Sequence, residues 1–73
     1  MDEALNRLNR VFGPEKGAAV YRELLAVLQL TTLSDPDDEM AFADLLIKRG
    51  GLDEAVGRSL RVRSILRGAK AQR

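Results

Sequence analysis

Glycine and proline divide this chain into four segments, and each segment has the apolar spacing of a helix. Gly13-Pro14 separates the first two segments, and Pro36 opens the third. Gly50-Gly51 separates the last two, and Gly68 ends the fourth. Proline is favoured in the first turn of a helix and glycine just after the last turn. We therefore expect four helices with short connections. The expected helices span residues 2–12, 14–30, 35–49 and 52–66.

The third segment has the strongest local helix signal. Asp35 can cap the helix, Pro36 takes its first position, and the acids at 37–39 face the positive end of the helix dipole. Lys48 and Arg49 lie in the last turn, where cations are favoured. The apolar residues of this segment cover more than half of its circumference. We therefore expect this helix either to be central to the fold or to meet another molecule.

The composition limits how such a chain can be stabilised. A chain of 73 residues forms one domain, and a domain this small depends on good packing or self-association. It contains no Cys and no His, which excludes disulfides and the usual zinc and haem ligands. We expect a single all-α domain over residues 1–68, a small four-helix bundle or orthogonal helical domain, followed by a frayed basic tail over 69–73.

The apolar positions predict a core that takes residues from every helix. The expected core residues are Leu5, Leu8, Phe12, Val20, Tyr21, Leu24, Leu28, Met40, Phe42, Leu46, Ile47, Leu52, Val56 and Leu60. Apolar surface left over on the second to fourth helices is expected to meet a partner. The candidate residues for this interface are Phe42, Leu45 and Ile65.

Charge is sorted along the chain. Residues 31–47 carry five acids and no base, whereas residues 48–73 carry eight bases and two acids. Because arginine matches phosphate oxygens, the fourth helix is a candidate for binding a nucleic-acid backbone or an acidic partner. The alternative is a solvated basic face. The candidate contact residues are Arg58, Arg61, Arg63, Arg67 and Lys70.

The acids that begin the third helix and the bases that end the fourth are complementary. In an antiparallel hairpin, residues 37–39 would lie near Arg67, Lys70 or Arg73. Between two chains, the same match would support an antiparallel dimer. The sequence is compatible with both alternatives.

Several classes of function are not expected for this chain. It has no His for general-base catalysis, no Cys nucleophile and no glycine-rich phosphate-binding loop. We therefore expect no enzyme, no cofactor, no metal site and no small-molecule substrate. No apolar run could span a membrane and no basic signal region is present, so we expect a cytoplasmic protein without a membrane partner.

Two functions fit the remaining pattern. The leading hypothesis is a small non-catalytic protein-protein interaction or regulatory module, an adaptor or subunit that could also self-associate as a homodimer. The alternative is a nucleic-acid-binding protein that uses the basic C-terminal helix. A helix-turn-helix fits poorly, because Leu46 stands where a small residue is usual, and Asp53 and Glu54 would repel phosphates.

Overall fold

The computed structural model describes residues 3–33 and 35–69, and the chain there forms four α-helices. They are α1 (Glu3–Phe12), α2 (Pro14–Leu28), α3 (Pro36–Arg49) and α4 (Gly51–Arg67). This confirms the prediction of an all-α, four-helix domain. The predicted start of the first helix, at residue 2, lies outside the described residues. Within the described ranges, no helix is long and apolar enough to cross a membrane.

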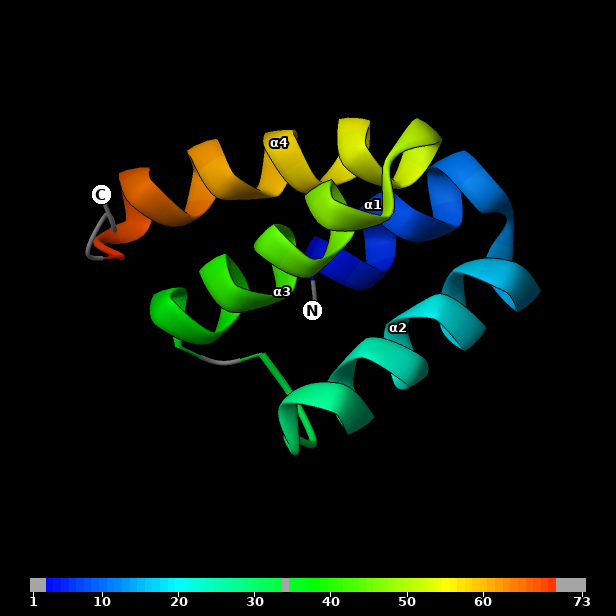
Figure 1. The fold of residues 1–73 in the computed structure, drawn as a ribbon, viewed down its shortest axis with the longest axis horizontal. Coiled ribbons are helices and arrows are strands. Elements are labelled where there is room, and N and C mark those ends of the chain that lie inside the picture. Colours follow the sequence, from blue (N-terminus) through cyan, green and yellow to red (C-terminus); the bar gives the residue numbers. More distant parts are fainter. Residues whose placement is uncertain (1–2, 34, 70–73) are drawn as a thin grey trace.

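The helices pair as two hairpins of sequence neighbours. α1 packs extensively against α2, and α3 against α4, whereas α2 meets α3 and α1 meets α4 over smaller areas. In Figure 1, α4 runs along the top, α3 lies beside it, and α2 lies along the lower edge. The whole fold measures 31 × 24 × 21 Å. α3 is therefore central, which explains why its apolar surface is so wide.

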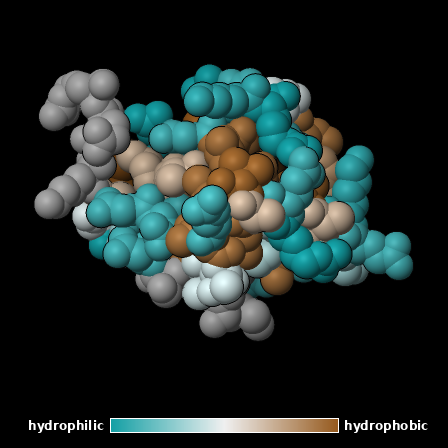
Figure 2. Space-filling model, turned by 60° about the horizontal axis from the view of Figure 1, so that its bottom comes forward, coloured by the Kyte–Doolittle hydropathy of each residue, from teal (hydrophilic) through white to brown (hydrophobic). Residues whose placement is uncertain are grey.

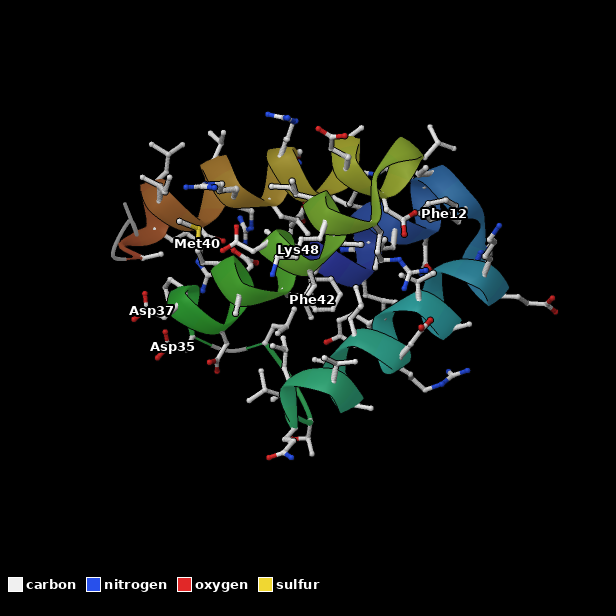
Figure 3. The ribbon with its side chains drawn as sticks, in the orientation of Figure 1. Phe12, Asp35, Asp37, Met40, Phe42 and Lys48 are labelled. Carbon is white, nitrogen blue, oxygen red and sulfur yellow. The ribbon has the colours of Figure 1, made fainter. Side chains whose placement is uncertain are left out.

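The core lies between the two hairpins. The Phe42 ring is fully buried between α3 and α2 (Figure 3), and its centroid lies 5.6 Å from that of Tyr21 on α2. All four helices and the loop before α3 contribute to this cluster. Its buried members are Ala4, Leu8, Val20, Leu24, Leu25, Leu33, Phe42, Ala43, Leu46, Val56 and Leu60.

Two predictions about apolar side chains are wrong. Phe42 was expected both in the core and on an interface, and complete burial leaves it only the first role. Leu52 was expected in the core but is 62% exposed. It directly follows the Gly50-Gly51 turn at the end of the α3–α4 hairpin, where one side of α4 faces solvent.

The start of α3 is formed as predicted. The backbone N–H of Asp37 donates a hydrogen bond to the Asp35 carboxylate, with a nitrogen–oxygen distance of 2.7 Å. Pro36 occupies the first helical position, where a missing N–H costs nothing. This cap fixes where α3 begins and so sets the position of the acids in its first turn.

The ends of α2 and α4 share one geometry. In α4, Gly68 adopts a φ of 114°, and the N–H groups of Gly68 and Ala69 donate to the carbonyl oxygens of Ile65 and Ser64. Ala69 is buried, so the predicted frayed tail does not include it. The rest of that tail, residues 70–73, lies outside the described residues.

α2 ends two residues earlier than predicted. Gln29 adopts a φ of 60°, and the N–H of Leu30 donates to the carbonyl oxygen of Leu25. This left-handed conformation is normally taken by glycine, so the sequence carries no clear stop signal here. The Leu30 side chain packs against the core cluster, which contains Leu25, and this contact favours the turn.

Two buried glycines bring the helices of each hairpin close together. A Cβ atom on Gly57 of α4 would lie 2.7 Å from the carbonyl oxygen of Ala43 on α3. A Cβ atom on Gly17 of α2 would lie 2.9 Å from the backbone nitrogen of Asn9 on α1. Both distances are shorter than a normal contact. Each pair of helices therefore approaches so closely that only glycine, which has no Cβ atom, fits at these two positions.

Candidate functional site

The arginines in the middle of α4 are paired with acids of the same chain. Nη2 of Arg58 lies 2.6 Å from Oε2 of Glu54, one turn earlier on α4. Nη1 of Arg61 lies 3.6 Å from Oδ1 of Asp44 on α3. Exposed pairs of this kind contribute little to stability. They do occupy the guanidinium groups that a phosphate would otherwise contact.

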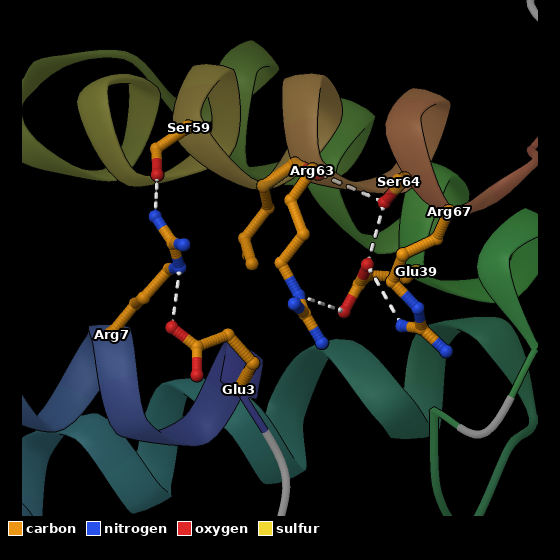
Figure 4. Close-up of polar contacts among 8 residues, drawn as sticks. Glu3, Arg7, Glu39, Ser59, Arg63, Ser64 and Arg67 are labelled. Carbon is orange, nitrogen blue, oxygen red and sulfur yellow. Dashed lines mark hydrogen bonds and ion pairs between the residues drawn. The ribbon is translucent and has the colours of Figure 1, made fainter.

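Arg63 and Arg67, in the second half of α4, converge on one carboxylate of α3 (Figure 4). The Glu39 side chain is only 2% exposed. Nη1 of Arg67 donates a hydrogen bond of 3.2 Å to its Oε1. Nε of Arg63 lies 3.5 Å from its Oε2, an ion-pair distance without hydrogen-bond alignment. A buried carboxylate is costly unless it is paired, and these contacts supply the pairing.

A serine completes this cluster. Oγ of Ser64 lies 2.8 Å from Oε1 of Glu39 and also 2.8 Å from the carbonyl oxygen of Leu60. The single hydroxyl hydrogen of Ser64 serves one of these acceptors at a time. The cluster joins the first turn of α3 to the last turns of α4, so the predicted pairing of acids and bases within one hairpin is confirmed for Glu39 and Arg67. Lys70 and Arg73 lie outside the described residues.

At the opposite end of α3, Arg49 links three helices. Its Nε lies 2.5 Å from Oδ2 of Asp53 on α4, and its Nη1 lies 3.3 Å from Oε2 of Glu23 on α2. The hydrogen bond that it donates to Asp53 raises the pKa of Arg49 above its ordinary value. From the sequence, Arg49 was interpreted only as a cation at a helix end. Its pairing could have been expected from the acid four residues further on, across the Gly50-Gly51 turn.

Arg7 of α1 makes a polar connection to α4. Its Nε donates a hydrogen bond of 2.9 Å to Oε2 of Glu3, and its Nη1 donates to Oγ of Ser59 (Figure 4). The Arg7–Ser59 contact was not predicted from the sequence. α4 is therefore held on one side by the acids of α3 and on another by α1.

The outward face of α4 is apolar. Four of the six strongly exposed large apolar side chains in the described part of the chain lie on this helix. They are Leu52, Val62, Ile65 and Leu66. Leu66 is 81% exposed and Val62 is 59% exposed. Large apolar side chains are usually exposed singly on a protein surface, so their alignment along one helix distinguishes this face.

The residues predicted for an apolar interface do not lie together. Ile65 is on the outward face of α4, Leu45 is half-buried against the core, and Phe42 is inside it. Val62 and Leu66 were not predicted as interface residues, although their spacing of four residues places them on one side of a helix. Of the three predicted residues only Ile65 is strongly exposed, so the exposed apolar side chains lie on α4 rather than on α3.

A groove lies beside this face, between α1 and α4. Its volume is about 220 Å³, and it is open to solvent. It is lined by Arg7, Arg10, Val11, Ala55, Val56 and Ser59. Over residues 3–33 and 35–69, no three acidic, His or Cys side chains are grouped so that they could hold a metal ion.

Apolar side chains also gather on a second face. Figure 2, which turns the α2 side of the fold toward the reader, shows them as a band bordered by hydrophilic side chains. Val27 of α2 is 62% exposed, as Leu52 is. Val27 is the one strongly exposed large apolar side chain that α2 carries among the described residues, whereas α4 carries four.

No protein-family model, curated protein or solved structure matches this chain. The geometry of α4 is therefore the basis for assigning a function. Its described arginines pair with acids of the chain, and four of its large apolar side chains face solvent. This arrangement is suited to contact with another apolar surface.

Proposed function

We propose that this chain is a small, non-catalytic interaction module that binds another protein through the outward face of α4. The observation that carries the proposal is the row of exposed Leu52, Val62 and Leu66 along one helix. Apolar side chains exposed along one helix favour association, because covering them removes apolar area from water. An adaptor, a regulator or a subunit of a larger assembly would use such a face. The absence of cysteine fits a reducing compartment such as the cytoplasm.

The energy available from this face is sufficient for a specific contact. Burying a leucine or valine side chain that is otherwise exposed contributes about 1.5–3 kcal/mol. Several such side chains offset part of the entropy that two proteins lose on association. A complex of micromolar strength, about −8 kcal/mol, is therefore within reach of this helix face and its flanks.

We expect Leu66→Asp to remove partner binding while the chain stays folded. The side chain is 81% exposed, so a charge there disturbs the partner rather than the core. Proteins that co-purify with the tagged chain from cell extract would be quantified by mass spectrometry, and circular dichroism would verify the helices. The proposal predicts at least about a tenfold loss of the bound partner, which corresponds to 1.4 kcal/mol.

The matched control for this experiment is Val27→Asp. It places the same charge at an exposed apolar position on α2, and we expect partner binding to be unchanged. Equal loss in both variants, or no loss in Leu66→Asp, would contradict the assignment of the binding face to α4.

Binding of a nucleic-acid backbone by α4 is the alternative proposal, and it has less support. The arginines 58, 61, 63 and 67 each have an acidic partner within the chain. Phosphate binding by Arg63 or Arg67 would leave the Glu39 carboxylate buried without its cations. The exposed apolar side chains of α4 also could not contribute to backbone binding, because contacts to phosphates are made by polar and charged groups.

We expect no salt-dependent binding of duplex DNA. Fluorescence anisotropy with a labelled duplex, at low and at moderate salt, would measure it. Nucleic-acid binding predicts a steep fall in affinity with salt and a further weakening in Arg61→Ala, but not in Arg22→Ala on α2. That pattern would favour the alternative over the protein-binding proposal.

A further inference from the structure

We propose that the outward face of α4 binds a second copy of this chain in antiparallel orientation, with Leu66 of each copy entering the α1–α4 groove of the other. This inference rests on the proposed function, since it uses the same face of α4. It adds the identity of the partner and the register of the contact. Spacing, size complementarity, the groove and charge support it.

The first support is the spacing of residues along the outward face. Positions 52, 55, 59, 62 and 66 follow each other at intervals of three, four, three and four residues. This is the spacing that keeps one stripe of a helix against a partner helix. The residues in the stripe are Leu52, Ala55, Ser59, Val62 and Leu66.

The second support is the alternation of large and small residues in this stripe. In an antiparallel pair that places Leu66 of one copy opposite Ala55 of the other, Val62 faces Ser59, and two-fold symmetry repeats both contacts. Leu66 and Val62 then each meet a smaller residue, and Leu52 lies level with position 69, beyond the end of the partner's α4. A parallel pair would place Leu66 against Leu66 and Ala55 against Ala55, which leaves a gap at the level of Ala55.

The third support is the groove beside Ala55. This groove has a volume of about 220 Å³, enough for the four carbon atoms of a leucine side chain, and Val11 and Val56 form part of its wall. Leu66 is the most exposed large apolar side chain in the described ranges. The antiparallel register brings this side chain of one copy directly over the groove of the other.

The fourth support is charge. α4 carries its acids, Asp53 and Glu54, in the first turn, whereas all of its basic residues come later, from Arg58 onward. An antiparallel pair opposes the two helix dipoles and adds a longer-range attraction between acids and bases that already pair within their own chains. A parallel pair would align the two dipoles and place every arginine level with its own copy, whereas in the antiparallel register only Arg61 lies near its own copy, at the two-fold axis. Charge and shape therefore favour the same orientation.

Disulfide cross-linking tests the orientation and register directly, because the natural chain has no cysteine. In the double variant Ala55→Cys/Leu66→Cys, the two sites lie 11 residues apart, about 16 Å along one helix, too far for a bridge within one chain. We expect mild oxidation to yield a covalent dimer. Leu66→Cys alone should cross-link no faster than Val27→Cys, which measures random collision.

Two outcomes of this experiment would overturn the proposal. The first is a double variant that cross-links no faster than Val27→Cys. The second is efficient cross-linking of Leu66→Cys alone, which indicates a parallel pair. Circular dichroism on each variant would verify that the helices are retained, as expected at these exposed positions.

The oligomeric state separates this inference from the proposed function. Sedimentation equilibrium on the natural chain should show a monomer–dimer equilibrium, and Leu66→Asp or the groove-filling Ala55→Leu should weaken it at least tenfold. A chain that stays monomeric at about 1 mM would overturn the second copy as partner. In that case the proposed function would stand if Leu66→Asp still removed the binding of a different protein. If Leu66→Asp removed no such binding, the proposed function and this inference would both fail.

Discussion

Replacing Glu39 by alanine is expected to lower the free energy of unfolding by about 2–3 kcal/mol. Breaking a buried ion pair by removing one partner typically costs 3–5 kcal/mol, and about a third of each arginine side chain is exposed here, which reduces the cost. The variant would leave Arg63 and Arg67 beside each other without their carboxylate. Since a chain of this length has a total stability of roughly 4–11 kcal/mol, the loss would be large.

Urea denaturation followed by circular dichroism measures this effect. The matched control is Asp38→Ala, which removes the same charge from the preceding position of α3, and we expect a loss below about 1 kcal/mol. Glu39→Gln should fall between the two, because it keeps the shape and an acceptor oxygen. Equal losses for Glu39→Ala and Asp38→Ala would show that the cluster contributes no more than the neighbouring charge in the first turn of α3.

Replacing Gly57 by alanine is expected to destabilise the fold by about 1–3 kcal/mol, the usual cost of overpacking. The new Cβ atom would lie 2.7 Å from the carbonyl oxygen of Ala43 and 2.9 Å from atoms of Leu46 and Ile47. A backbone oxygen cannot move aside as a side chain can, so α3 and α4 would have to separate. Separation would also loosen the contacts of Glu39 on the same helix pair.

The sign of this change is the decisive measurement. Helix propensity alone predicts that Gly57→Ala stabilises α4 by about 1 kcal/mol. Thermal or urea unfolding that shows stabilisation would therefore contradict the close approach of α3 and α4. Ala55→Gly, two residues away at an exposed position, measures the propensity effect in the same helix without the crowding.

The helices were predictable because their boundaries carry local chemical signals. The Asp35 cap and the Gly50-Gly51 turn act on the backbone within a few residues, so the sequence alone locates them. The end of α2 was not predictable in this way. Gln29 takes a conformation that its own side chain does not favour, and packing of Leu30 on the core compensates for it.

The candidate site was predictable only in part, for a related reason. Charge order predicts that the start of α3 and the end of α4 attract each other, but it does not say that Glu39 is buried. Burial follows from the short distance between the helices, which Gly57 permits. The sequence also gives α4 two apolar stripes at helical spacing, and periodicity alone does not say which of them faces α3. The glycine beside Val56 is the signal that identifies the buried stripe.

The pairing of sequence neighbours has a consequence for how the chain acquires its structure. Each extensive contact joins helices that follow one another directly, so neither hairpin needs a distant segment in order to close. Helical domains with such local contacts fold within microseconds to milliseconds. On the ribosome, which adds residues far more slowly than this, α1 and α2 can close on each other before α4 has been synthesised. The carboxylate of Glu39 would be paired only after the last turns of α4, which carry Arg63 and Arg67, have been synthesised.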